Sequence, residues 1–228
     1  MATEINELTE QYLRAKAIRD CNNLMGKFEF YFSDFRMKQL VKLWANRPDC
    51  TLEVPYGCYE GIGGIKRCFL QDYGDRNDPN TQKYMEGTMM VHGCSTENII
   101  VANDLQTVRA AYISNGIETF GKGIQLKDYR NKALWRYAKY GVDFILEDGQ
   151  WKIWHLHVYQ LFETPWETCW TEAQPYAGYP IRPTHIDREP IRPIYQWTMT
   201  TKYPHDEPLP PKPYDKFEDV EPGYGYFA

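Results

Sequence analysis

The pattern of apolar and polar positions divides the chain into a helical N-terminal part and a strand-rich middle. Within residues 4–25, apolar side chains recur at three- and four-residue steps, as in Leu8, Tyr12, Ala15 and Ile18, which is the period of an amphipathic helix. A second helical pattern follows in "KFEFYFSDFRMKQLVKLWAN", and the sequence "NRPDC" ends it. The two segments are predicted to form either one bent helix or two helices.

The pattern then changes to that of strands. "TLEVPYGCYEG" predicts a short strand and a turn, "GGIKRCFLQDY" a brief helix, and "GDRNDPNTQ" a polar loop. Strand patterns continue in "EGTMMVHGCSTENIIVAND" and "TVRAAYISNGIETF", and "GKGIQLKDYRNK" is a predicted loop. Two long strand patterns then flank Asp148 and Gly149, a strong hairpin signal. Because helices come first and long helices do not alternate with the strands, the predicted class is α+β with an antiparallel sheet.

The C-terminal part has a different composition. Of the 15 prolines, 11 lie from Pro175 onward, together with seven tyrosines. Proline excludes a regular helix or a sheet interior, but disordered tails are usually poor in aromatic residues. We therefore expect a domain at 1–170 and an extended arm at 171–228 that packs on its own domain or on a partner subunit. A disordered tail is the alternative.

Charge and cysteine content narrow the classes of function. The net charge is −5 and no run of Lys or Arg occurs, which argues against a nucleic-acid partner. No stretch approaches the roughly 20 apolar residues of a membrane helix, and "MATEINELTEQYLRAK" lacks the apolar core of a signal peptide. The six cysteines are scattered without a CxxC pair. This disfavours a zinc site and predicts reduced thiols in a cytoplasmic protein.

Two acidic or basic positions in apolar surroundings are candidates for chemistry. Asp34 lies in the aromatic segment "FEFYFSDF"; it is either buried with a partner or a solvated residue at a helix end. His92 follows the apolar run "MMV", where a histidine is either structural or catalytic. The glycine-rich "YEGIGGIK" lacks the spacing of a phosphate-binding loop and predicts only a tight turn into a helix.

The stretch "WKIWHLHVY" places two histidines two residues apart in a predicted strand. His155 and His157 therefore point to the same face. The opposite face is also largely apolar, as in a strand that is covered on both sides. If that pair faces a pocket, the histidines bind a ligand; otherwise they are structural. A metal site completed by His92 is a further, less favoured alternative.

The order of these elements resembles the nuclear transport factor 2-like superfamily, and within it the SnoaL-like branch of polyketide cyclases and scytalone dehydratase. The resemblance is carried by "YFSDFRMKQLVKLWA", "GCYEGIGGIKRCF", a histidine ahead of "ENIIVANDLQTVRAAY", and the terminal "EDGQWKIWHLHV". It covers roughly residues 5–162. It implies a cone-shaped α+β fold, in which a curved antiparallel sheet and N-terminal helices enclose a pocket.

The resemblance also implies a function. In many of the lyases a helix Asp and a strand His form an acid–base dyad, and the matching positions here are Asp34 and His92, with Ser33 as the alternative to Asp34. We expect a cofactor-independent lyase, dehydratase or isomerase, without a metal, that acts on a small aromatic or cyclic molecule and forms a homodimer or a larger homo-oligomer. A non-catalytic binding or dimerisation module of the same fold is the alternative.

Further residues are expected to contact the ligand. Tyr31 and one of His155 or His157 are candidate hydrogen-bond donors to a developing oxyanion. The predicted walls of the pocket, chosen by strand parity, are Tyr59, Tyr112 and Trp135.

Overall fold

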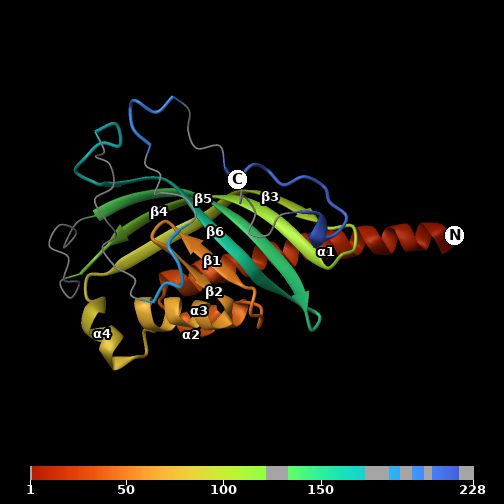
Figure 1. Cartoon of the computed structure of the whole chain (residues 1–228), viewed down its shortest axis with the longest axis horizontal. Helices are drawn as coiled ribbons and strands as arrows, with labels where there is room; N and C mark the ends of the chain where they lie inside the picture. The colour runs from red at the N-terminus through yellow and green to blue at the C-terminus, as the bar shows by residue number, and fades with distance from the viewer. Residues whose placement is uncertain (1, 122–132, 173–184, 191–196, 203–206, 221–228) are drawn as a thin grey trace.

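A curved six-stranded sheet with helices on one face forms the body of the protein (Figure 1). The structure is a computed structural model, which describes residues 2–121, 133–172, 185–190, 197–202 and 207–220. The strand order is β2-β1-β6-β5-β4-β3. The α+β cone predicted from the sequence is confirmed. The predicted loop at 122–132 lies outside the described residues.

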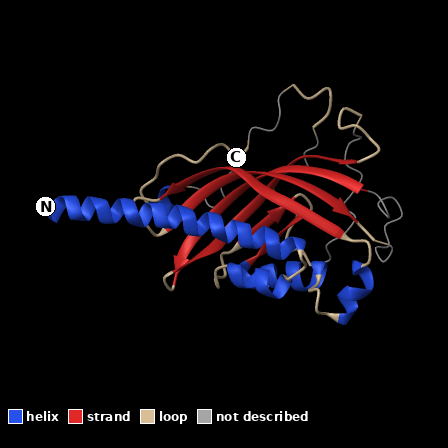
Figure 2. Ribbon diagram, turned by 180° about the vertical axis from the view of Figure 1, so that it is seen from behind, coloured by secondary structure: helices blue, strands red, loops and turns tan. Residues whose placement is uncertain are grey.

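One long helix opens the chain. Helix α1 (Ala2–Ser33) runs across the sheet (Figure 2) and is followed by α2 (Met37–Leu40) and the 3₁₀ turn η1 (Val41–Leu43). The predicted second helix, at 27–46, is therefore split, and its first part belongs to α1. The break lies at Phe35, which is buried and has a φ of 52°. A left-handed residue ends a helix, and here it turns the chain towards α2.

A small unit follows at one edge of the sheet. It contains β1 (Thr51–Val54), β2 (Gly57–Glu60), α3 (Gly61–Arg67), the π-helical turn η2 (Cys68–Tyr73) and α4 (Pro79–Met85). Helix α4 corrects the loop predicted for "GDRNDPNTQ". The Asp78 side chain accepts a hydrogen bond from the backbone N–H of Asn80, and Pro79 occupies the first helical position. Both residues favour a helix start.

Four long strands form the rest of the sheet: β3 (Met89–Val101), β4 (Thr107–Thr119), β5 (Ala133–Glu147) and β6 (Gln150–Pro165). They pair antiparallel in chain order, whereas β1 pairs parallel with β6. The predicted hairpin is confirmed, because Asp148 and Gly149 connect β5 and β6 with φ values of 49° and 72°. Two positive φ angles define the turn type that matches the twist of a hairpin.

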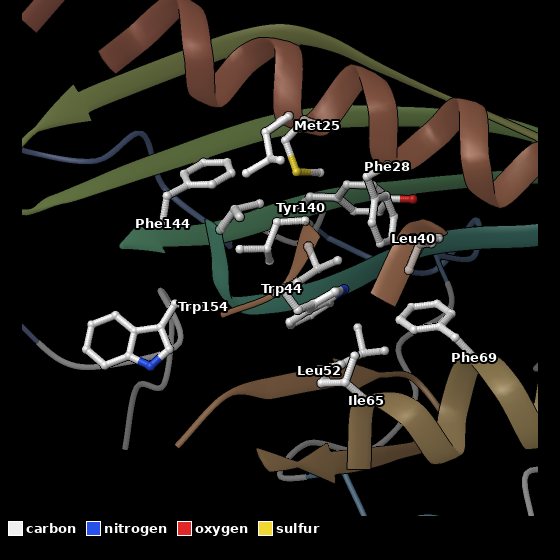
Figure 3. Close-up of a cluster of buried hydrophobic side chains, with 14 of the residues drawn as sticks. Met25, Phe28, Leu40, Trp44, Leu52, Ile65, Phe69, Tyr140, Phe144 and Trp154 are labelled. Atoms are coloured by element: carbon white, nitrogen blue, oxygen red, sulfur yellow. The ribbon is translucent and has the colours of Figure 1, made fainter. Parts of the chain in front are cut away.

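The main core lies between the sheet and the helices. We call the face of the sheet that α1 covers the inner face and the opposite one the outer face. In Figure 3, side chains from α1 pack over the inner face, and those from α2, β1, α3 and η2, together with Trp44, close the cluster on the other side. The labelled residues include Met25, Phe28, Trp44, Leu52, Ile65, Phe69, Tyr140 and Phe144.

The described parts of the C-terminal arm pack on the outer face and on the β2 edge. Arg188 forms an isolated bridge with Cys58 of β2. The Phe217 ring lies 4.2 Å from the Trp154 ring, between centroids, and Tyr214 bonds Thr107 through its hydroxyl. The arm therefore covers apolar and charged side chains that would otherwise face water.

Candidate active site

A cavity opens between the inner face and the helices. The volume that the centre of a water molecule can occupy in it is about 60 Å³. Such a volume holds roughly four to six waters. Its walls are mostly apolar, and one end is charged. The lining comes from α1, the β1–β2 turn, η2 and the sheet: Phe28, Phe32, Leu52, Val54, Pro55, Tyr56, Cys68, Phe69, Tyr73, His92, Glu118, Arg136, Tyr140, Leu156 and Val158.

His92 lies in this lining, held against the neighbouring strand. It pairs with Gly116 in the register of β3 and β4. A Cβ atom on Gly116 would come within 2.8 Å of Nδ1 of His92, which is closer than real contacts allow. The missing side chain therefore lets the imidazole lie across β4, and the Phe32 ring packs against it in a T-shaped arrangement with the ring centroids 5.7 Å apart.

Glu118 is the partner of this imidazole. Its Oε1 lies 2.8 Å from Nε2 of His92. Burial by itself raises the pKa of Glu118, but Arg136 and His92 together hold that pKa below its usual value. The ionised carboxylate can only accept a hydrogen bond, so Nε2 carries the proton and donates it. Among the residues that the structure describes, no group hydrogen-bonds Nδ1.

Arg136 joins this pair to a second carboxylate. Its Nη1 lies 3.2 Å from Oε1 of Glu118, and its Nε donates to Oε2 of Glu163 at 2.6 Å. Burial raises the pKa of Glu163, and the nearby Glu118 adds to this effect. The charged end of the cavity is thus a network of His92, Glu118, Arg136 and Glu163, with the guanidinium between two buried carboxyl groups.

Two tyrosines of the lining are hydrogen-bonded to each other. The hydroxyl oxygens of Tyr56 and Tyr73 lie 2.6 Å apart. Burial raises the pKa of both phenols, so both hold their protons at neutral pH. One hydroxyl must donate to the other; when Tyr56 donates, the O–H of Tyr73 remains for a ligand.

A third carboxyl group lies next to the cavity on α1. Glu29 is buried, and the Sγ of Cys94 donates to its Oε1 at 3.3 Å. No described group bonds its Oε2. Burial raises the pKa of Glu29, partly offset by the charge of His92 and by hydrogen bonds from Cys94 and Tyr140. The pKa of this α1 carboxyl group therefore depends on His92 and Tyr140 as well as on burial.

The Asp34–His92 dyad implied by the resemblance is not formed. Asp34 lies beyond the end of α1 with its side chain 44% exposed, and its carboxylate forms ion pairs with Arg36 and Arg76. These arginines lower its pKa, Arg36 most of all. Asp34 is a solvated residue at a helix end, because the positive φ of Phe35 turns the chain away from the cavity there.

His155 and His157 share a strand face, as predicted, but it is the outer face. The cavity is lined by Leu156 and Val158, which alternate with them along β6. Nδ1 of His155 lies 3.0 Å from Oδ2 of Asp143, and Nε2 lies 3.1 Å from the carbonyl oxygen of Asp49. Nε2 of His157 lies 3.8 Å from Oε1 of Glu53. The structure therefore places neither histidine in the lining of this cavity.

The arm explains why both faces of this strand are apolar. Phe217 stacks near His155, with ring centroids 5.6 Å apart. Arg188 pairs with Glu53 at 3.2 Å, beside His157. A register shift at Asp143/Phe144 also places an extra residue in β6, so Trp154 and His155 stack on each other although they are sequence neighbours.

The remaining predicted ligand-binding residues do not line the cavity. Tyr59 is buried, and its hydroxyl donates to Oδ2 of Asp72 at 2.8 Å. Trp135 stacks on Trp166 at 5.1 Å, and its neighbour Arg136 occupies the inner face instead. Tyr112 is buried and Tyr31 half-buried, but both lie outside the lining.

The structure gives no support to a metal site in the described residues, where no group of three or more His, Cys, Asp and Glu side chains could hold an ion. His92 lies on the inner face, and His155 and His157 lie on the outer one.

In the described part of the chain, no helix is long and apolar enough to cross a membrane.

Sequence reasoning missed the partners of His92. Glu118 and Arg136 lie in strand patterns, where an isolated charge is usually solvent-exposed. Parity gave one usable signal. Glu118 shares a strand face with Gly116, Ser114 and Tyr112, and the first of these pairs with His92. That signal becomes usable only when the register of β3 and β4 is known.

Solved structures share this fold. A candidate scytalone dehydratase from Novosphingobium aromaticivorans is 14% identical, with 72% of this chain and 96% of that chain covered and a TM-score of 0.52. Hexachlorocyclohexane dehydrochlorinase LinA-type3 from Novosphingobium barchaimii is also 14% identical, with coverage of 70% and 96% and a TM-score of 0.53. LinA type 2 is 15% identical, covers 73% and 99%, and has a TM-score of 0.53.

These matches define a class of fold, and they confirm the predicted resemblance at that level. The chain has the α+β cone fold of scytalone dehydratase-like and LinA-like structures, in which N-terminal helices close a curved sheet. No protein-family model and no curated protein sequence matches the chain.

Proposed function

We propose that the protein is a cofactor-independent lyase of the dehydratase type, acting on a small cyclic molecule. The observation that carries the proposal is the His92–Glu118 hydrogen bond of 2.8 Å in the wall of an otherwise apolar cavity. The imidazole is half-buried, and it is hydrogen-bonded to a carboxylate that is buried. Such a group inside a cavity is a reasoned candidate for catalysis.

In this proposal His92 is the general base and Glu118 orients it. Nε2 donates to Glu118, so the lone pair of Nδ1 is the basic site. The carboxylate fixes this tautomer and stabilises the imidazolium that forms. Histidine suits the task because its ordinary titration range is near neutral pH, and such a base contributes about 10²–10⁴-fold to rate.

The tyrosine pair is the proposed oxyanion donor, in place of Tyr31 and the β6 histidines. A carbonyl oxygen placed at the hydroxyl of Tyr73 gains a hydrogen bond that strengthens as negative charge develops. The second hydroxyl, on Tyr56, holds the first in position at 2.6 Å. Both phenols stay protonated, as a donor must.

The reaction that fits these groups is the elimination of water from a β-hydroxy ketone. Nδ1 of His92 takes the proton from the carbon next to the carbonyl, and the electrons of that C–H bond form an enolate. The enolate then expels the β-hydroxyl as the C–O bond breaks. The imidazolium returns its proton to the leaving oxygen, which departs as water, and the histidine is regenerated neutral.

Cavity size limits the substrate. Four to six water positions correspond to roughly 120–180 Å³ of liquid volume at about 30 Å³ per water. This is enough for a single six-membered ring with small substituents. The apolar walls, with Phe28, Phe32 and Phe69, favour a ring over a highly charged molecule.

The experiment is a dehydration assay with 3-hydroxycyclohexanone, read by the ultraviolet absorbance of cyclohex-2-enone. We expect turnover above the buffer rate and a loss of about 10²–10⁴-fold in kcat for His92→Ala. Asp34→Asn is the matched control and should keep full activity. Wild-type protein that binds cyclohexanone, seen as ligand-induced thermal stabilisation, but turns nothing over would instead favour the binding module.

A further inference from the structure

The apolar stripe that predicts an amphipathic helix in residues 4–25 faces away from the body of the protein. Leu8 is 65% exposed, Tyr12 is 64% exposed and Ile18 is 38% exposed; Ala15, between them, is also exposed. A different side of α1 packs into the core, through Ala17, Cys21 and Met25. We call Leu8, Tyr12, Ala15 and Ile18 the outward stripe.

The first turns of α1 also extend beyond the sheet (Figures 1 and 2). Arg14 joins α1 to the end of β3, because it donates to the carbonyl of Val101 at 3.1 Å and to Oδ1 of Asn103 at 3.0 Å. Residues 2–13 lie before it, about 18 Å of helix at 1.5 Å per residue. The side chains at 6–13 are all exposed, so packing these turns against another surface removes apolar area from water.

The charges along the first part of α1 favour an antiparallel pairing of two copies of this helix. "ATEINELTEQY" at 2–12 contains three glutamates and no Lys or Arg, whereas "LRAKAIRD" at 13–20 contains three basic residues and one aspartate, which gives net charges of −3 and +2. Within one copy, Arg14 pairs with Glu10, and both Lys16 and Arg19 pair with Asp20. Two copies of α1 that pair antiparallel place the acidic part of each beside the basic part of the other. A parallel pair places like charges together, which costs stability.

We propose that the outward stripe is a self-association surface, on which a second copy of this chain docks its own α1 antiparallel with a crossing near Tyr12. The contact has the self-complementary form of a two-fold dimer. Apolar side chains fill the seam as in other paired helices. Because two helices bury less than a standard interface of about 1,600 Å², we expect a dissociation constant in about the micromolar range.

The test is sedimentation velocity of the full chain from about 1 to about 200 µM, a range that brackets the expected constant. Wild-type protein should shift from monomer to dimer, and Leu8→Glu/Tyr12→Glu should stay monomeric with an unchanged circular dichroism spectrum. Phe30→Glu is the matched control: Phe30 is 80% exposed on the same helix but lies far from the crossing, so this variant should still dimerise.

Orientation is tested by cross-linking in a Cys169→Ser background. Oxidised Tyr12→Cys should form a disulfide-linked dimer, whereas Leu8→Cys should not, because an antiparallel crossing at residue 12 separates the two copies of residue 8 by about 12 Å along the axis. Wild-type protein that is monomeric throughout, or a dimer that survives Leu8→Glu/Tyr12→Glu, overturns the proposal. So does a monomer whose stripe instead binds anionic lipid vesicles.

Discussion

The imidazole of His92 and the carboxylate of Glu118 lie on adjacent strands with Nε2 2.8 Å from Oε1, and Gly116 is the residue that lets them meet. Arg136 of the neighbouring strand β5 contacts the same carboxylate. A carboxylate that fixes one imidazole nitrogen leaves the other free for proton transfer.

Glu118→Gln should remove the charge that orients and stabilises His92. We expect kcat for dehydration to fall by about 10²–10⁴-fold, comparable with the loss of a general base, with a much smaller change in KM. The measurement is steady-state kinetics beside Asp34→Asn, which should match the wild type. Full activity of the Glu118→Gln variant would remove Glu118 from the mechanism.

Gly116→Ala should displace the imidazole, because the new Cβ lies 2.8 Å from Nδ1 of His92. We expect a large loss of kcat. Gly149→Ala is a poor control because its φ is 72°, whereas Gly26→Ala meets no atom within 4 Å and should leave activity unchanged. Equal activity of the Gly116→Ala and Gly26→Ala variants would contradict the close approach.

Glu29→Gln should stabilise the protein at pH 8 but not at pH 4. Burial raises the pKa of Glu29 in the folded state. The folded state therefore holds this proton more tightly than the unfolded state, and the associated stability is lost as pH rises through the folded pKa. Glutamine carries no such penalty. Thermal unfolding at both pH values measures the effect, with Glu7→Gln on the exposed part of α1 as the control.

Asp143→Asn should destabilise the fold and leave the inner-face site intact. Asp143 is fully buried, and it accepts from Arg109 at 2.8 Å and pairs with His155. Removing its charge takes away the buried carboxylate that faces Arg109, and breaking such a buried ion pair costs about 3–5 kcal/mol. Urea unfolding measures this loss. A variant that remained folded but lost dehydration activity would instead place the outer face in the catalytic machinery.

Asp143 should also make the free energy of unfolding depend on pH in the acid range. Burial acts to raise the pKa of Asp143, but His155 and Arg109 lower it overall. The stability it contributes is present above the unfolded pKa and is lost as pH falls through the folded one. Between pH 5 and pH 2 the wild type should therefore lose more unfolding free energy than Asp143→Asn.

The sequence predicted the class of fold because its strongest signals are local. The helical period of α1 and the Asp148–Gly149 turn need no long-range information. The face of a strand is different. Parity correctly grouped His155 with His157, but the choice between inner and outer face depends on where α1 and the arm pack. Both faces of β6 are apolar because each is covered, so the composition of the strand does not indicate which face points towards α1.

The candidate site was only partly predictable for a related reason. His92 was found because a histidine in an apolar run is unusual. Its partner, Glu118, is 26 residues away and becomes a neighbour only through the β3–β4 register. The aromatic segment around Asp34 marks it as a candidate and the resemblance implies its role in a dyad, but the left-handed residue Phe35, which turns the chain away from the cavity, leaves no mark in the hydrophobic pattern.

The most direct test of the account is the long-range ¹H–¹⁵N NMR spectrum of His92, recorded above the ordinary titration range of an imidazole. The central claim is that Glu118 holds the proton on Nε2 and that Nδ1 is the free base. We predict the Nε2–H tautomer in the wild type and a mixture of tautomers in Glu118→Gln. A proton on Nδ1 in the wild type, or identical spectra for the two proteins, would contradict the account.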